Sequence, residues 1–134
     1  MIRMKTAVNL ILGLLVVSII VVICGVVLLS LAFAPKIWVS EERTGGLTIS
    51  GADFDTGGEI EITYEGVPNR RGPVKASRLV GAGTGEFIFR DRVTPTSDDP
   101  ADAAKTVVIT ATNLRSKEVA TTTASGKPWV RPQK

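Results

Sequence analysis

The pattern of hydrophobic and polar positions divides the chain into two parts. From Thr6 to Ala34 there is no charged residue, and valine, isoleucine and leucine dominate the run. As a helix, this run is longer than the about 20 residues that cross the hydrocarbon core of a bilayer. All acidic residues lie at Glu41 or beyond, where apolar and polar residues alternate over short stretches. The pattern therefore predicts an N-terminal apolar helix followed by a β-rich domain.

We interpret residues 1–35 as a short cytoplasmic N-terminus and an uncleaved transmembrane helix. The run is longer than the apolar region of a secretory signal, which has only about 7–15 residues. "AFA" (32–34) resembles a motif that precedes a cleavage site, but Pro35 follows it directly and is expected to block cleavage. Arg3 and Lys5 precede the run, so the positive-inside rule places the N-terminus in the cytoplasm and the rest outside. The sequence thus predicts a single-pass protein of the cell membrane, with the lipid bilayer as a partner.

The chain after residue 45 reads as a series of short strands. In "LTISGADFDTGGEIEITYEG" (47–66) a strand, a corner and a second strand follow one another, and Ile60, Ile62 and Tyr64 alternate with polar residues. Such alternation is typical of a strand with one buried face. Further strands are predicted at 74–81, 86–93, 105–113 and 117–125, separated by turn-rich segments. Residues 36–45 are expected to be a juxtamembrane linker, and residues 126–134 a flexible basic tail.

The predicted core takes the inward-facing apolar residue of each strand. It consists of Leu47, Ile49, Phe54, Ile60, Ile62, Tyr64, Phe87, Phe89, Val107, Ile109 and Val119.

Three segments resemble prokaryotic immunoglobulin-like domains. They are "LTISGADFDTGGEIEITYEG", "GAGTGEFIFRDRV" and "KTVVITATNLRSKEVATTTA", and the resemblance covers about residues 46–125. It implies a sandwich of adhesive or spacer type, with no catalytic residues to carry over. The predicted fold class is therefore an all-β antiparallel Ig-like sandwich preceded by one long N-terminal transmembrane α-helix.

Charge and composition exclude several classes of function. The chain has 16 basic and 13 acidic residues, and Arg3 and Lys5 account for most of the excess. The rest is nearly balanced, so we expect no nucleic-acid partner. Histidine is absent, and the only cysteine, Cys24, lies in the apolar run. Without the commonest general base and zinc ligand, we predict neither an enzyme nor a cofactor.

Two groups of acidic residues could carry chemistry. Asp98, Asp99 and Asp102 lie in one loop and offer hard oxygen ligands for an ion such as calcium. Their spacing matches no calcium-binding loop, so the sequence does not decide whether this loop binds an ion. The glutamates of the strand at 59–65 lie on its predicted solvent face. We interpret them as partners for cations on neighbouring strands.

The candidate interaction residues are basic or aromatic positions that we expect at the surface. Trp38 suits the aromatic belt beside a membrane. Four cations cluster in "NRRGPVKASR", and the tail adds a tryptophan and an arginine among prolines. The full set is Trp38, Arg70, Arg71, Lys75, Arg78, Trp129 and Arg131.

These features predict a non-catalytic accessory or structural subunit of a membrane or cell-envelope assembly. Its partners would be other membrane or envelope proteins, bound through helix packing and the outer domain. One alternative is a pilin-like filament subunit with the apolar helix in the filament core. Another is a surface adhesion module.

Overall fold

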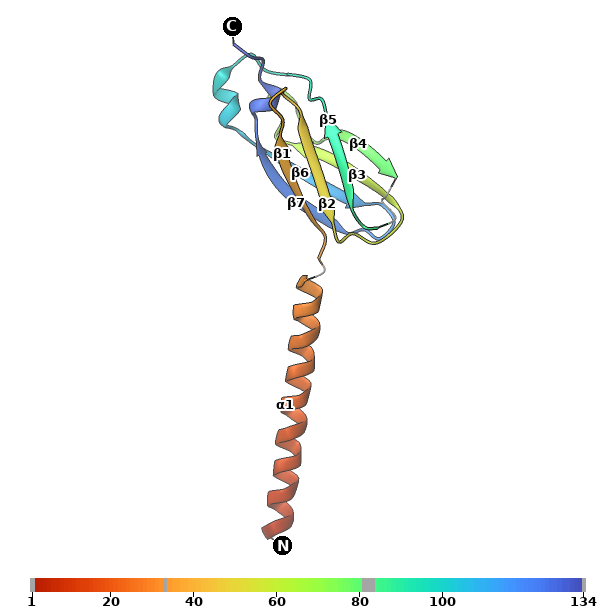
Figure 1. Ribbon diagram of the computed structural model, residues 1–134. Helices are drawn as coiled ribbons and strands as arrows, with labels where there is room; N and C mark the ends of the chain where they lie inside the picture. Colours follow the sequence, from red (N-terminus) through yellow and green to blue (C-terminus); the bar gives the residue numbers. More distant parts are fainter. Residues whose placement is uncertain (1, 33, 81–83, 134) are drawn as a thin grey trace. The chain divides into compact units, whose positions relative to one another are not determined.

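The computed structural model describes residues 2–32, 34–80 and 84–133, with side chains described at 8–23, 34–78 and 84–133. The chain forms two compact units, residues 1–34 and residues 35–134. Figure 1 shows their elements, one helix in the first unit and seven strands in the second.

The first unit consists of helix α1 (Ile2–Ala32), so the apolar run does form one helix. Its described side chains, from Val8 to Ile23, are all exposed. Asn9 and Ser18 are the only polar side chains among them, and apolar residues lie on every face of the helix.

The membrane predictions are corrected by this structure. Within its described residues, no helix combines the length and the apolar character needed to cross a membrane. A span requires about 20 consecutive apolar residues, and the described part of α1 does not provide them. The fold class predicted above is therefore wrong in its transmembrane helix. The single-pass cell-membrane localisation, with a cytoplasmic N-terminus and an extracytoplasmic domain, is wrong for the same reason.

The second unit contains two antiparallel sheets. The three-stranded sheet has the order β1-β2-β5, formed by β1 (Lys36–Glu41), β2 (Leu47–Ala52) and β5 (Phe87–Asp91). The four-stranded sheet has the order β4-β3-β6-β7, formed by β3 (Glu59–Glu65), β4 (Val74–Val80), β6 (Thr106–Asn113) and β7 (Val119–Ser125). Two short 3₁₀ turns, η1 (Pro100–Ala104) and η2 (Lys127–Trp129), complete the unit.

Most of the predicted core is buried between the sheets. The alternation of β3 is as expected, with Ile60, Ile62 and Tyr64 buried and the glutamates facing outward. Phe54 is buried against Phe87, with ring centroids 5.6 Å apart. Phe89, by contrast, is only partly buried.

The last strand is predicted in the wrong orientation. Val119 is 53% exposed, whereas its neighbour Ala120 is buried. Successive side chains of a strand face opposite sides, so an assignment that is off by one residue reverses the whole strand. The large apolar valine suggested the inner face, but β7 turns its small residues inward.

The predicted linker contains a strand. Lys36–Glu41 pairs with β2 along its whole length, from Lys36 opposite Ala52 to Glu41 opposite Leu47. Ile37 is buried and Val39 packs against the core. The alternation in "KIWVSE" is short, and its position beside the apolar run led to the interpretation as a linker.

One side of the sandwich is closed and the other is open. At the closed side β1 packs against β7, and the hydroxyl of Ser125 donates a 2.8 Å hydrogen bond to Glu41. The other two sheet edges are β5 and β4, which lie on the opposite side (Figure 1). Within the described residues neither of these two edges has a partner strand, and we call this the open side of the sandwich.

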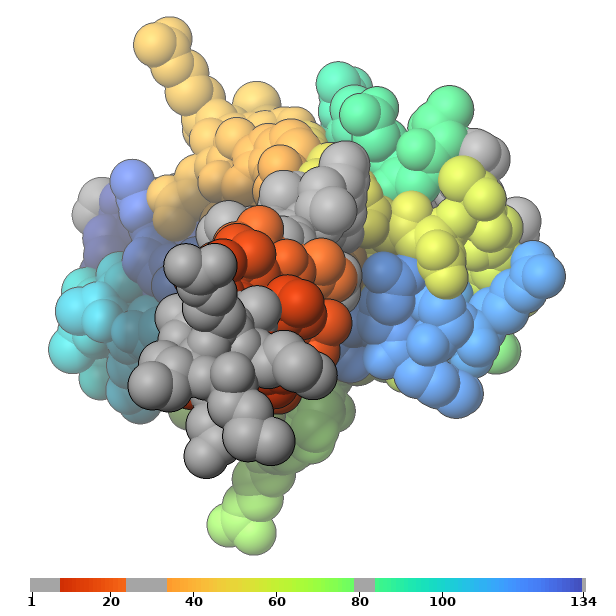
Figure 2. Space-filling view, turned by 90° about the horizontal axis from the view of Figure 1, so that it is seen from below, coloured from red at the N-terminus to blue at the C-terminus, as the bar shows by residue number. Residues whose placement is uncertain are grey.

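A buried asparagine fixes the end of the sandwich where β6 turns into β7. Asn113 accepts hydrogen bonds from the backbone N–H of Arg115 (3.0 Å) and Ser116 (3.2 Å) through Oδ1. Its amide donates to the carbonyls of Asp55 and Gly57, both at 3.4 Å. Figure 2 shows the turn, in mid-blue, beside this corner, in yellow.

Candidate functional site

A cleft lies on the open side of the sandwich, and we call it the edge cleft. It has a volume of about 210 Å³ and lies between the beginning of β4 and the end of β5. Tyr64 and Trp129 line it on one side, and Val67, Val74 and Val93 add apolar surface. Its charged groups are Arg70, Lys75, Asp91 and Arg92.

A hydrogen bond between the two sheets crosses the edge cleft. The Tyr64 hydroxyl, from β3, donates to Oδ2 of Asp91, at the end of β5, over 2.7 Å. Burial, together with the bond to this carboxylate, raises the pKa of Tyr64 well above its ordinary value. The ring of Trp129 meets that of Tyr64 edge to face, with centroids 5.2 Å apart. This part of the cleft is therefore a fixed aromatic and hydrogen-bonded surface.

The turn that carries Arg70 is tied to the strand-like segment after β5. The Thr96 hydroxyl donates to the carbonyl of Pro68 over 2.6 Å, and Asn69 donates to the Thr96 carbonyl over 2.9 Å. The backbone N–H of Thr96 in turn bonds the carbonyl of Trp129 over 2.8 Å. These bonds hold the turn, the segment and the C-terminal region together around the cleft.

The charges of the edge cleft are unequally satisfied. Lys75 forms a 3.3 Å ion pair with Glu61, and Asp91 accepts the bond from Tyr64. Within the described residues, the guanidinium groups of Arg70 and Arg92 form neither an ion pair nor a hydrogen bond. Arg92 also lines a neighbouring hollow beside Glu42 and Gly45. The cleft therefore presents an excess of positive charge.

Only part of the predicted set of interaction residues meets at this cleft. Arg70, Lys75 and Trp129 line it, whereas Trp38, Arg71, Arg78 and Arg131 are not among its lining residues. Trp38 is exposed on β1. Their role in interactions stays a prediction, but their environments are now defined.

Several of these residues already have partners within the chain. Arg78 pairs with Glu59, as Lys75 does with Glu61, so the acidic face of β3 meets cations across the β3–β4 ladder. Trp129 is only 3% exposed, because η2 folds it against Tyr64. The tail from residue 126 is therefore packed at η2, contrary to the flexible tail that we predicted. The tryptophan itself is a core residue and is not free to dock elsewhere.

Sequence reasoning missed the central members of the cleft. Tyr64 was placed in the core, but a buried tyrosine hydroxyl requires a partner, and this was a signal for a polar site. Asp91 and Arg92 follow the alternation of β5, and nothing local distinguishes them from ordinary surface charges.

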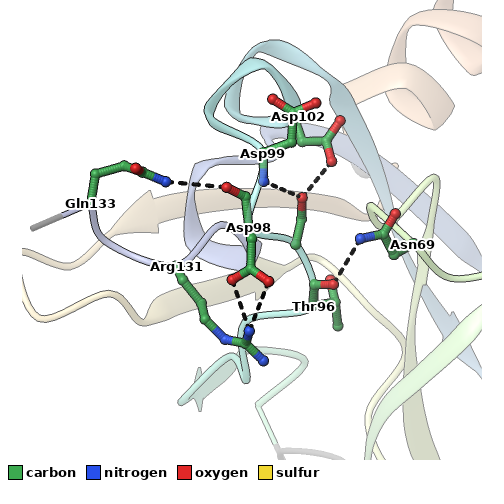
Figure 3. A network of polar contacts seen from close by, with 8 residues as sticks. Asn69, Thr96, Asp98, Asp99, Asp102, Arg131 and Gln133 are labelled. Atoms are coloured by element: carbon green, nitrogen blue, oxygen red, sulfur yellow. Dashed lines mark hydrogen bonds and ion pairs between the residues drawn. The ribbon is translucent and has the colours of Figure 1, made fainter.

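The carboxylates of the acidic loop have different partners within the chain, and Figure 3 shows those of Asp98 and Asp102. Asp98 accepts two hydrogen bonds from the Arg131 guanidinium, at 2.8 and 3.0 Å. Asp99 caps η1 by accepting from the N–H of Ala101 at 2.9 Å. Asp102 is buried and accepts from the Ser97 hydroxyl, while Lys105 lies 2.8 Å from its other oxygen. In the described residues these side chains stabilise the loop itself.

The electrostatics of Asp102 follow from those contacts. The hydrogen bonds from Lys105 and Ser97 hold the pKa of its carboxyl below the ordinary value. The same contact with Asp102 raises the pKa of the Lys105 ammonium group. Both groups are therefore charged across the neutral range.

Comparisons with known proteins leave the family undefined. No family model matches the chain, and no characterised protein matches it in sequence. Among solved structures, the superoxide reductase (neelaredoxin) of Ignicoccus hospitalis resembles it with a TM-score of 0.46 and 14% sequence identity. That match covers 70% of this chain and 79% of the other. A likeness at this level carries no conclusion about fold or activity. The resemblance to Ig-like domains and the absence of catalysis both stay predictions.

Proposed function

We propose that this protein is a non-catalytic assembly protein, and that α1 packs against the apolar helices of other subunits. The observation that carries the proposal is the surface of α1. Its large apolar side chains from Val8 to Ile23 are all exposed. Their exposed fraction ranges from 49% at Val16 to 68% at Leu10. A helix that is apolar all round is normally buried in its working state, because exposing such an area to water is costly.

The distribution of apolar residues on α1 favours several neighbours over one. A two-stranded coiled coil buries a narrow stripe and leaves a polar outer face. The described part of α1 has no polar face, since Asn9 and Ser18 stand alone among apolar residues. Covering the whole circumference requires a bundle in which each helix is surrounded.

The β unit supports a structural role in the assembly. Residues 35–134 enclose a core of their own, built from both sheets. The chain has no histidine, and the edge cleft contains arginines, a lysine and a hydrogen-bonded aspartate. This set suits binding by charge more than proton transfer at neutral pH.

Photo-crosslinking in the cells that make the protein tests the proposal. A photoreactive amino acid at Val16 of the full chain is expected to give protein adducts of discrete mass, which mass spectrometry assigns to further copies or to other subunits. Adding Ile19→Asp should abolish them, because a carboxylate in an apolar helix contact is strongly disfavoured.

A matched control comes from the β unit. Ile88→Asp alters an apolar residue outside the helix that is even more exposed, at 69% against 51% for Ile19. It should leave the adducts from Val16 unchanged. The proposal is wrong if Val16 yields only lipid adducts or none, or if the protein adducts survive Ile19→Asp.

A further inference from the structure

The edge cleft lies between two strand edges that have no partner strand in the described part of the chain. β4 ends the four-stranded sheet and β5 ends the three-stranded sheet. A free strand edge offers unpaired N–H and C=O groups, and an extended segment of another protein can pair with them.

The two edges differ in how well they can accept another strand. The β3–β4 register shifts between Ile62 and Thr63, whose partners are Ser77 and Lys75, so Ala76 is left as a bulge. A bulge interrupts the ladder and twists the edge. The pairing of β5 with β2 is continuous from Phe87 to Asp91. β5 is therefore the regular edge beside the cleft.

The charge of the cleft selects the side chain that could enter it. Arg70 and Arg92 have no ion-pair partner among the described residues, whereas Asp91 is already hydrogen-bonded to Tyr64. The planar guanidinium group presents paired donors that match a carboxylate.

The size of the cleft favours a single group over a whole small molecule. Its volume of about 210 Å³ is below the roughly 300–1,000 Å³ of pockets that enclose drug-sized ligands. It suits one side chain or one chain end, whose apolar stem would lie against Val67, Val93 and Trp129.

We propose that the edge cleft binds the carboxylate of an extended segment from a partner protein. The segment pairs with the free edge of β5, and Arg70 and Arg92 hold the carboxylate, which comes from an acidic side chain or from a C-terminus. This inference goes beyond the proposed function, because it rests on the β unit and does not depend on α1.

Fluorescence of the full chain provides the test. The chain has two tryptophans, so Trp38→Phe leaves Trp129, which lines the cleft, as the only one. The probe is a nine-residue peptide of alternating threonine and valine with a central glutamate, blocked at both ends. We expect it to change the Trp129 emission in a saturable way. The glutamine version should bind about tenfold more weakly or worse, because it loses a charge-assisted hydrogen bond.

Two sets of variants locate the binding. Arg70→Gln together with Arg92→Gln should remove the preference for glutamate over glutamine. Arg90→Gln is the matched control, since Arg90 is an exposed cation of β5 that does not line the cleft. It should leave that preference unchanged. Thermal unfolding of each variant confirms that the fold is retained.

A second peptide distinguishes the two sources of the carboxylate. It lacks glutamate and has a free C-terminus, and its amidated form is the control. Tighter binding of the free form assigns the cleft to a chain end, whereas tighter binding of the glutamate peptide assigns it to an acidic side chain. The proposal is overturned if no peptide binds, if charge makes no difference, or if Arg90→Gln weakens binding as much as the double variant.

Discussion

The hydroxyl of Tyr64 donates a 2.7 Å hydrogen bond to Asp91 and so links the two sheets on the open side of the sandwich. Within the described residues β4 and β5 do not pair with each other, in contrast to the neighbouring strands within each sheet. A polar contact between the sheets therefore forms part of the lining of the edge cleft.

Tyr64→Phe should lower the free energy of unfolding by about 1–2 kcal/mol, because it removes a partly buried hydrogen bond to a charged acceptor. Urea unfolding measures the change. Thr63→Ser is the matched control, since Thr63 is a partly exposed neighbour on the same strand and does not line the cleft. A phenylalanine variant as stable as the original protein would show that the bond contributes nothing.

The ionisation of Tyr64 should be displaced to high pH. It is the only tyrosine of the chain, so ultraviolet absorbance of phenolate reports it alone. Its pKa is raised in the folded state, so its contribution to stability is complete below pH about 10 and is lost as pH rises further. We expect phenolate to appear only as the protein unfolds. Asp91→Asn should shift the titration toward lower pH, and a normal titration of the folded protein would contradict this environment.

The Asp102 contacts predict a loss of stability in acid. The pKa of Asp102 is lowered in the folded state, so its contribution is present above the unfolded value of about 4 and disappears as pH falls below it. Urea unfolding from pH 7 to pH 2.5 should show this decline. Asp102→Asn should flatten that part of the curve, whereas Asp98→Asn, at an exposed ion pair, should change it much less.

Asn113→Ala should be among the most destabilising single changes in the β unit, at about 2–3 kcal/mol. It leaves the N–H groups of Arg115 and Ser116 without their acceptor and opens a void at a fully buried position. Thr112→Ala, one residue earlier and only partly buried, is the control. Equal costs for the two variants would refute a special role for the asparagine.

Gly51→Ala tests the close approach between β2 and β5. A Cβ at Gly51 would overlap with the ring of Phe87, its neighbour across the ladder. We expect a cost of about 1–3 kcal/mol from overpacking, seen in thermal unfolding. Adding Phe87→Leu should recover part of it, since the smaller side chain makes room. No recovery would locate the strain elsewhere.

The sequence predicted those parts of the fold that a local pattern encodes. The strict alternation of Ile60, Ile62 and Tyr64 defined the inner face of β3, and the helix over the apolar run was also evident. The orientation of β7 was not evident, because either Val119 or Ala120 could face the core. Only the pairing of β7 with β6 decides which of the two does so. Trp129 was predicted at the surface, but it is buried against Tyr64, and the neighbouring bridge joins Ser97 and Val130, which are distant in sequence.

The edge cleft could not be predicted from local sequence patterns either, because it too is formed by segments that are distant in sequence. Its residues come from β3, the turn before β4, the beginning of β4, the end of β5 with the segment that follows it, and the C-terminal region. Topology alone brings them together, so Arg70 was predicted as a surface cation without its neighbour Arg92.

The position of β1 has a mechanical consequence. α1 ends at Ala32 and β1 begins at Lys36, so tension on the helix enters the β unit through its first strand. That strand is paired along its full length with β2, and Glu41 is bonded to Ser125 of β7. A pull on α1 must therefore be borne by the ladder of β1 before any other part of the β unit can yield.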